Sequence, residues 1–363
     1  MHGNSQPVSN NWTPYNYYGK AQKSAVYPFG AGTMKEELIV RVLEILQEAG
    51  FIVSQRCEAR SFDLAARRNE LTLLAKIMRN IDGLNEEVAR SIKRVAFYLL
   101  ASPLVIGERS GAAFLEDDVV YHRYGIPAVN PHTLHNYMVD GVEPYVFSAT
   151  GGVYVTIDGT AMKAAREEKA LSFGDLASKL GVSKRSISKY EEGSMGTTIE
   201  IALKLEELLD TILIAPLEFL KAEREEPPAA VLTEGPEEAV SRLERRILDM
   251  MQELGFAIFT TAYAPFRAVS FTEPPIKARE ESEKILTGIS DYSEQMLRRA
   301  RILSSVSRVM QTRSVFVVNG RSKYVQIDNT ALIGKDELEH IRDQDEFTSV
   351  LDERAKLKCL VRS

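Results

Sequence analysis

Polar side chains between residues 184 and 189 have the types and spacing that suit contact with nucleic acid. Lys184, Arg185 and Lys189 carry positive charge, and Ser188 carries a hydroxyl. Arg and Lys donate to O6 and N7 of guanine, and Ser can donate or accept, so the set suits base edges in the major groove. Ser183 predicts a helix start, whose free N–H groups suit a phosphate. We therefore expect a DNA-reading helix over 183–192.

Short helices must hold this segment in place, and the sequence predicts them at 160–168, from 172, at 184–192 and from 197. Ser172 and Asp175 have the spacing of an N-terminal capping box, and Gly181 suits the left-handed turn that joins two helices. Thr197 and Glu200 predict a second such box. The expected inward residues recur at helical spacing: Met162, Ala165, Leu176, Ala177, Leu180, Ile187, Tyr190, Ile199, Ala202, Leu205 and Leu209.

The run from 165 to 195 resembles the helix-turn-helix of the lambda-repressor/Cro type. The matching segments are Arg-Glu-Glu-Lys-x-Leu-Ser, Leu-Ala-x-x-Leu-Gly-Val-Ser and Ile-Ser-x-Tyr-Glu-x-Gly. The resemblance implies that Lys184, Arg185 and Lys189 read bases. It also implies a structural ion pair between Arg166 and Glu191.

The chain departs from that family pattern at two positions near the DNA. Phe173 stands where the family often has a Gln that contacts phosphate, and Glu192 stands where a polar residue is common. A carboxylate repels phosphate, so we expect weaker backbone contacts here, or contacts supplied by Lys179 and neighbouring segments.

Two segments that flank the helical region repeat one pattern. Residues 38–51 read LIVRVLEILQEAGF, and residues 243–256 read LERRILDMMQELGF. Each is followed by short apolar strands, a long helix and another apolar strand. The repeated order predicts two related α/β domains.

A second candidate chemistry concerns Asp63 and Lys76, which lie on successive predicted strands. Their placement resembles the restriction-endonuclease-like fold, whose site needs an acid on one strand and acid-x-Lys on the next to hold Mg²⁺. Leu74 stands where the second acid is required. In the second copy we align Lys284 with Lys76, and Thr272 falls near Asp63. Neither copy has the full set, so we expect degenerate domains with no catalytic residues, no metal and no cofactor.

Composition shifts divide the chain into domains. Residues 1–33 contain no Asp or Glu and show no apolar periodicity, and residues 223–236 are rich in Pro and acidic residues. We predict the following order: a disordered extension (1–33), a first α/β domain (34–150), an all-α helix-turn-helix domain (151–222), a linker (223–236), a second α/β domain (237–345) and a C-terminal tail (346–363).

The overall composition is that of an ordinary globular protein, with a net charge of −6. This charge argues mildly against nucleic acid, but affinity for DNA depends on a local basic surface. Cys57 and Cys359 give no disulfide framework or zinc spacing, which favours a reducing cytoplasm. No apolar run approaches the length of a membrane span.

Over residues 34–342 the sequence also resembles an archaeal family of helix-turn-helix transcriptional regulators with the same three-part arrangement. We predict a cytoplasmic, non-enzymatic regulator that binds double-stranded DNA as a homodimer, with a small-molecule effector left open. Two alternatives remain open from the residues: a Mg²⁺-dependent nuclease targeted by the helix-turn-helix, and a non-catalytic protein-binding scaffold.

Overall fold

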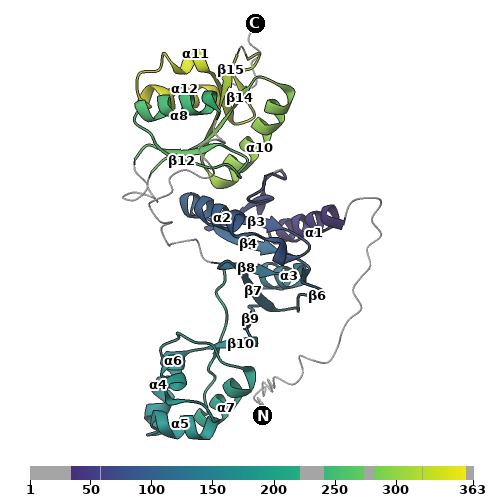
Figure 1. The fold of residues 1–363 in the computed structure, drawn as a ribbon, viewed down its shortest axis with the longest axis vertical. Coiled ribbons are helices and arrows are strands. Elements are labelled where there is room, and N and C mark those ends of the chain that lie inside the picture. Colours follow the sequence, from purple (N-terminus) through teal and green to yellow (C-terminus); the bar gives the residue numbers. More distant parts are fainter. Residues whose placement is uncertain (1–33, 58, 221–240, 274–281, 321, 357–363) are drawn as a thin grey trace, which may run out of the picture.

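The structure is a computed structural model that describes residues 34–57, 59–220, 241–273, 282–320 and 322–356. The predicted N-terminal extension and linker lie outside the described residues. Figure 1 shows the two α/β domains next to each other, with the helix-turn-helix domain at the far end of the first one.

The first α/β domain surrounds a twisted sheet. Its elements are α1 (Met34–Glu48), β1 (Ile52–Val53), β2 (Leu64–Arg68), β3 (Leu71–Ile77), the 3-10 helix Ile81–Gly83, α2 (Glu86–Leu99), β4 (Ser102–Ile106), β5 (Arg109–Ser110), β6 (Ala113–Phe114), β7 (Val119–Arg123), β8 (Ile126–Val129) and α3 (Pro131–Met138). Apolar residues of α1 and α3 cover one face of the sheet, and α2 covers the other. Asn85 caps α2 by accepting a hydrogen bond from the N–H of Val88.

The same sheet continues into the helix-turn-helix domain. Its strand order is β1-β2-β3-β4-β8-β7-β9-β10-β11, where β9 is Val146–Ala149, β10 is Gly152–Ile157 and β11 is Ile214–Ala215. The predicted boundary at 150 therefore falls in the turn of the β9–β10 hairpin. The helices between β10 and β11 are α4 (Gly159–Glu168), α5 (Phe173–Leu180), α6 (Lys184–Glu191) and α7 (Ile199–Leu209).

The second α/β domain is built on a six-stranded sheet, in the order β12-β13-β14-β15-β17-β16. Its elements are α8 (Arg242–Glu253), β12 (Ala257–Thr260), β13 (Ala268–Phe271), β14 (Lys284–Asp291), α10 (Glu294–Met310), β15 (Arg313–Asn319), β16 (Gln326–Ile327), β17 (Thr330–Gly334), α11 (Lys335–Leu338) and α12 (Gln344–Lys356). Phe347 and Leu351 of α12 are buried against α8 and the sheet. The predicted tail from residue 346 is therefore wrong over 346–356, which belong to the packed domain.

The two α/β domains share one topology. In each, the first three strands pair antiparallel, the next two join in parallel, and a final short strand pairs antiparallel. Even the helix ends agree, because α2 and α10 both stop at a residue in the left-handed conformation, Leu100 (φ 55°) and Gln311 (φ 53°). The repeated pattern in the sequence thus corresponds to a repeated arrangement of strands.

The two domains are joined by a common apolar core. Phe62, Ala65 and Leu74 from the first domain and the end of α2 lie in one cluster with Phe259, Phe271 and most of the buried residues of α10. Tyr98 of α2 stacks on Phe259 with ring centroids 4.3 Å apart. Both α2 and α10 are therefore buried between the two sheets, and neither domain's core is closed without the other.

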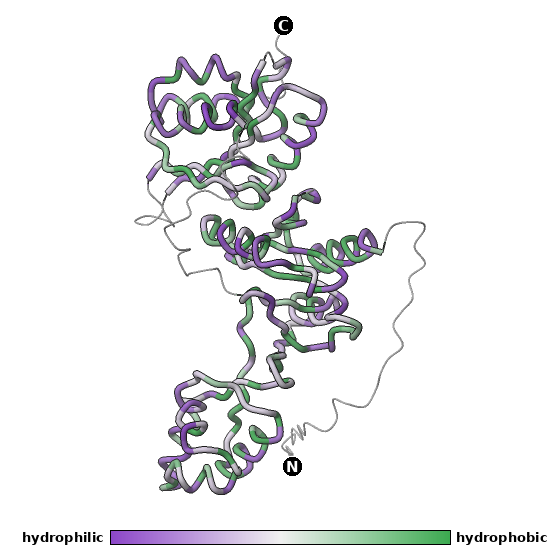
Figure 2. The backbone as a smooth tube through the Cα atoms, in the orientation of Figure 1, coloured by the Kyte–Doolittle hydropathy of each residue, from purple (hydrophilic) through white to green (hydrophobic). Residues whose placement is uncertain are grey.

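Hydropathy along the chain follows this arrangement, as Figure 2 shows. Strands inside the sheets are mostly hydrophobic, and exposed helices alternate between hydrophilic and hydrophobic residues. Several predicted boundaries shift by one or two residues. One such correction is at the start of α7, where Thr198, and not Thr197, is the N-cap. Thr197 is buried instead, where its hydroxyl donates to the hydroxyl of Tyr190 at 3.1 Å.

Candidate nucleic-acid interface

The turn between α5 and α6 is fixed by local hydrogen bonds. Ser172 and Asp175 form the reciprocal capping box at the start of α5, and Gly181 ends that helix with φ 70°. Ser183 caps α6 by accepting from the N–H of Ser186 at 3.0 Å. Both helices therefore begin at a serine cap, and α5 ends at a glycine, which together set the turn between the two helices.

One side of α6 packs into the core of the domain, and its other side faces solvent. Ile187 and Tyr190 are buried in the helical core, whereas Lys184 and Arg185 are exposed at the start of the helix. Ser188 and Lys189 are half-buried. The residues predicted to contact DNA thus lie on the faces of α6 that do not form the core.

Two further predicted contacts lie on or near α5. Lys179 is exposed in the last turn of α5. The Lys184 side chain extends toward Gly174, because a Cβ atom added there would lie 3.1 Å from its Cε and 3.3 Å from its Nζ. Lys184 of α6 therefore reaches the N-terminal turn of α5. There the hydrogen bond from Ser172, together with the charges of Lys179 and Lys184, lowers the pKa of Asp175.

An ion pair holds α4 against α6. Arg166 Nε donates to Glu191 Oε1 at 2.5 Å, and the two side chains are only 12% and 8% exposed. The guanidinium also donates to the carbonyl oxygen of Leu171 at 3.0 Å. The hydrogen bond to Glu191 raises the pKa of Arg166. Such a pair fixes the geometry of the two helices, since removing either partner would leave a charge largely buried.

The structure gives Phe173 a role that its departure from the family pattern did not predict. The Arg166 guanidinium lies over the Phe173 ring, 4.7 Å from its centroid. Phe173 therefore closes the open side of the Arg166–Glu191 pair by a cation–π contact. The only sequence signal for this contact is an aromatic residue seven positions after Arg166.

Glu192 has a partner that sequence reasoning also missed. Ser188 Oγ donates to Glu192 Oε1 at 2.7 Å, across one turn at the end of α6. The carboxylate that would repel phosphate is therefore held along the helix by a residue of the predicted reading surface. The i, i+4 spacing of the two residues is the signal that could have indicated this bond.

The Asp63 region of the first α/β domain differs from a metal centre. Asp63 Oδ1 lies 3.2 Å from Lys35 Nζ, and its Oδ2 lies 3.2 Å from Lys76 Nζ. The N–H of Ile77 also donates to Oδ2 at 2.8 Å. Burial lowers the pKa of Lys76. Two lysines and a backbone amide thus already satisfy the one carboxylate.

The place of the missing second acid is occupied by a core residue. Leu74 is fully buried in the core that joins the two α/β domains. A carboxylate there would be surrounded by apolar side chains, and an isolated buried charge is costly. The residues of β2 and β3 include no acid, so the donor set does not fit a divalent cation.

Strand register corrects the alignment of the second copy. The N–H of Asp63 donates to Ala75 O at 2.8 Å, and the N–H of Arg267 donates to Thr287 O at 2.7 Å in the corresponding place. Asp63 therefore corresponds to Arg267, and not to a position near Thr272. In this register Ala75 of β3 corresponds to Thr287 of β14. Lys76 therefore corresponds to Gly288, which lies four residues after Lys284.

In the second copy, Arg267 pairs with Glu244 of α8 at 3.0 Å, so the charges are reversed relative to Asp63 and Lys35 of α1. This copy lacks both the acid and the lysine of the endonuclease pattern. Across the described ranges, no group of three or more His, Cys, Asp or Glu side chains could hold a metal ion. Within those ranges, no helix is long and apolar enough to cross a membrane.

Comparison with known families assigns two parts of the chain. Residues 35–144 match the PD-(D/E)XK superfamily domain, and residues 162–212 match a helix-turn-helix domain. These matches confirm the predicted restriction-endonuclease-like fold beside an all-α helix-turn-helix. No solved structure gives a significant match to the chain.

Relatives extend the similarity over most of the chain. A protein from Methanococcoides burtonii, named "Putative HTH-type transcriptional regulatory protein", is 44% identical over 324 residues, which cover 89% of this chain and 98% of the relative. Proteins of the same type are 40% identical in Natronomonas pharaonis and 38% identical in Halobacterium salinarum, each with 89% of this chain and 99% of the relative covered.

Proposed function

The chain belongs to a family of archaeal helix-turn-helix-type transcriptional regulatory proteins, and we propose that it binds specific DNA sequences by placing α6 in the major groove. The observation that carries the proposal is the exposure of Lys184 and Arg185 at the start of a helix whose opposite side is locked into the core. Side chains at this end of a recognition helix reach base edges.

The proposed contacts fall into two classes. Arg185, Lys184 and Lys189 donate to bases, since Arg and Lys match the acceptors of guanine. Ser183 and the free N–H groups that follow it bind a phosphate, and Lys179 binds a second one. Ser188 contributes to the reading surface once its bond to Glu192 opens.

We expect a homodimer on DNA, because one helix-turn-helix reads only a half-site and two-fold pairs of half-sites lie about one helical turn apart. The α/β domains support and position the DNA-binding domain through the continuous sheet that runs into β10 and β11. Since archaeal genomic DNA lies in the cytoplasm, the protein is expected to act there.

A nuclease is the second candidate, because residues 35–144 match the PD-(D/E)XK superfamily. The observations against it are Leu74 in the place of the second acid and the two lysines that neutralise Asp63. We therefore propose that this domain is not catalytic and that it serves as a scaffold.

The decisive experiment is selection of genomic fragments by the full chain, with and without Mg²⁺, followed by titration of any enriched site at two salt concentrations. We expect an intact, symmetric motif whose affinity falls as salt rises, since bound cations release counterions from DNA. Absence of enrichment would contradict the proposal. Fragments cut only with Mg²⁺ would favour the nuclease, and Asp63→Ala would then have to abolish cutting.

A further inference from the structure

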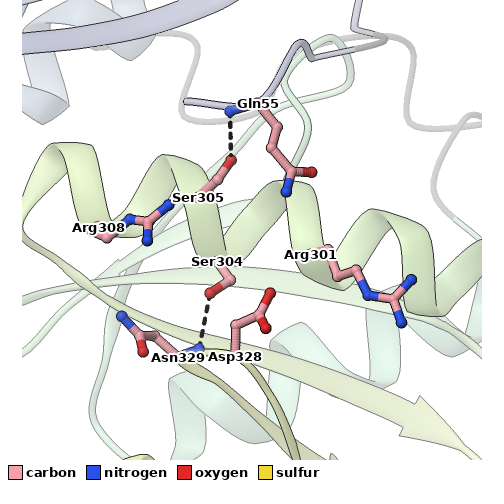
Figure 3. A pocket seen from close by; sticks show the side chains of 7 residues that line it. All are labelled: Gln55, Arg301, Ser304, Ser305, Arg308, Asp328 and Asn329. Atoms are coloured by element: carbon pink, nitrogen blue, oxygen red, sulfur yellow. Dashed lines mark hydrogen bonds between the residues drawn. The ribbon is translucent and has the colours of Figure 1, made fainter. Parts of the chain in front are cut away.

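The contact between the two α/β domains contains a polar pocket in addition to its apolar core. The pocket has a volume of about 280 Å³ and is lined by Gln55, Arg301, Ser304, Ser305, Arg308, Asp328 and Asn329 (Figure 3). Gln55 comes from the first domain, and the others come from α10 and the turn between β16 and β17. The second domain therefore provides six of the seven lining residues, and the first domain provides Gln55.

Hydrogen bonds fix the walls of the pocket. The N–H of Gln55 donates to Ser305 Oγ at 3.0 Å, and the N–H of Asn329 donates to Ser304 Oγ at 2.9 Å. Both serines are buried on α10, so they tie the first domain and the β16–β17 turn to one helix. The walls are thus set before any ligand arrives, which lowers the entropic cost of binding.

The charged side chains that line the pocket form no ion pairs with one another. Arg301 and Arg308 are exposed, and within the described part of the chain neither makes an ion pair. They are two helical turns apart on α10, and Figure 3 shows them on either side of the two serines. Asp328, on the turn, also makes no ion pair among the described residues. Two cations and one anion are therefore available to a ligand.

The lining narrows the chemical class of that ligand. Guanidinium groups bind phosphate by charge-assisted hydrogen bonds. The Asp328 carboxylate and the amides of Gln55 and Asn329 suit hydroxyl groups. No aromatic or aliphatic residue lines the pocket, which disfavours a nucleobase. The volume lies at the lower end of ligand sites, which excludes a large cofactor.

We propose that this pocket binds a small phosphorylated polyol of the sugar-phosphate class, which bridges the two α/β domains. This goes beyond the proposed DNA-binding function and does not depend on it. The phosphate of bound DNA is the other source of the same chemistry. It is disfavoured because the helix-turn-helix lies beyond the first α/β domain, away from the contact between the two α/β domains (Figure 1).

The repeat within the chain provides a matched control. When α2 and α10 are aligned at their left-handed ends, Leu100 and Gln311, Arg301 corresponds to Arg90 and Arg308 corresponds to Phe97. Arg90 pairs with Glu86 on the same helix and lies outside the pocket. Arg90→Ala therefore removes an exposed arginine from an equivalent helix without changing the proposed site.

The test is calorimetric titration of the full chain with ribose 5-phosphate, inorganic phosphate and ribose. We expect ribose 5-phosphate to bind most tightly, and the R301A/R308A variant to weaken it by about tenfold or more, as loss of a charge-assisted hydrogen bond predicts. Arg90→Ala should leave binding unchanged. Both variants alter exposed side chains, and an unchanged melting temperature without ligand would verify their folding.

Three results would overturn the proposal. No binding of ribose 5-phosphate up to about 10 mM would do so, as would binding that R301A/R308A leaves unchanged. Inorganic phosphate binding as tightly as ribose 5-phosphate would remove the polyol from the proposal. A loss of affinity for duplex DNA in R301A/R308A, without binding of the small phosphates, would assign the pocket to the DNA backbone. Because these titrations need no DNA site, their failure is separable from failure of the proposed function.

Discussion

Single residues of α6 carry the proposed specificity. Arg185 is exposed in the first turn and makes no ion pair within the described ranges, so its guanidinium is available to a base. Lys184 differs, because its side chain extends toward Gly174 of α5. Base reading is therefore expected to depend more on Arg185 than on Lys184.

Arg185→Ala should weaken binding to the selected site by about 1–3 kcal/mol and relax the sequence preference, because a bidentate contact to one base pair is lost. The measurement is a titration of the selected duplex and a scrambled duplex at two salt concentrations. Lys204→Ala, which removes an exposed cation from α7, is the control. Equal loss of affinity on both duplexes would show that Arg185 contacts only phosphate.

At the level of elements, the approach of α4 to α6 depends on a glycine. A Cβ atom added at Gly159 would overlap the carbonyl oxygen of Glu191 and lie 2.8 Å from that of Tyr190. Both obstacles are backbone atoms at the end of the recognition helix, and they can move only with the helix. Gly159 and the Arg166–Glu191 pair therefore both set the position of α6 against α4.

Gly159→Ala should destabilise the helix-turn-helix domain by about 1–3 kcal/mol, the range for overpacking, and should weaken DNA binding with it. Thermal unfolding and DNA titration measure the two effects. Gly334→Ala is the matched control, since the nearest atom to its added Cβ lies at 4.0 Å. An unchanged melting temperature in Gly159→Ala would show that the two helices separate freely.

The strand β3 gives a second prediction at this scale. Leu74→Glu supplies the acid that the endonuclease pattern lacks, but it places the carboxylate in the core between the domains. We expect a loss of about 3–5 kcal/mol of stability, as for an uncompensated buried charge, and no Mg²⁺-dependent cleavage of DNA. Urea unfolding and a cleavage assay test this.

Val40→Glu is the control for Leu74→Glu, because Val40 is 41% exposed on α1 and tolerates a charge. A folded Leu74→Glu variant that cuts DNA would show that the first domain is a nuclease lacking a single residue. It would also contradict the proposed scaffold role.

For the whole molecule, the shared core makes the two α/β domains one folding unit. Phe259 of the second domain is fully buried, stacks on Tyr98 of the first and lies under the Arg94 guanidinium, 4.8 Å from its ring centroid. Both of these ring contacts cross the boundary between the domains. The continuous sheet into β10 and β11 links this unit to the DNA-binding domain.

Phe259→Ala should lower the free energy of unfolding by about 3–5 kcal/mol, the range for a large cavity. It should lower the unfolding temperature of both α/β domains together. Scanning calorimetry of the full chain measures this as a shift of one transition. Phe114→Ala, at a ring that is 65% exposed, should cost less than about 1 kcal/mol. Separation of the α/β transition into two would contradict a common core.

Local patterns were sufficient for much of the architecture. The capping residues Ser172 and Ser183 and the turn at Gly181 predicted the helix-turn-helix, because caps and left-handed turns depend on nearby residues. The resemblance of residues 165–195 to a known family supplied the Arg166–Glu191 pair. The helix periodicity and the repeated motif ending in Gly-Phe predicted two related α/β domains.

Features that depend on contacts between distant residues were beyond such patterns. The match of Asp63 to Arg267 rests on hydrogen-bond register, and nearby sequence similarity had suggested Thr272. The packing of α12, the burial of Leu74 between the domains and the pocket that joins Gln55 to Arg301 all arise when the two sheets close on α2 and α10. Packing across such distances follows from the sum of many weak apolar contacts, and no local spacing of residue types encodes it.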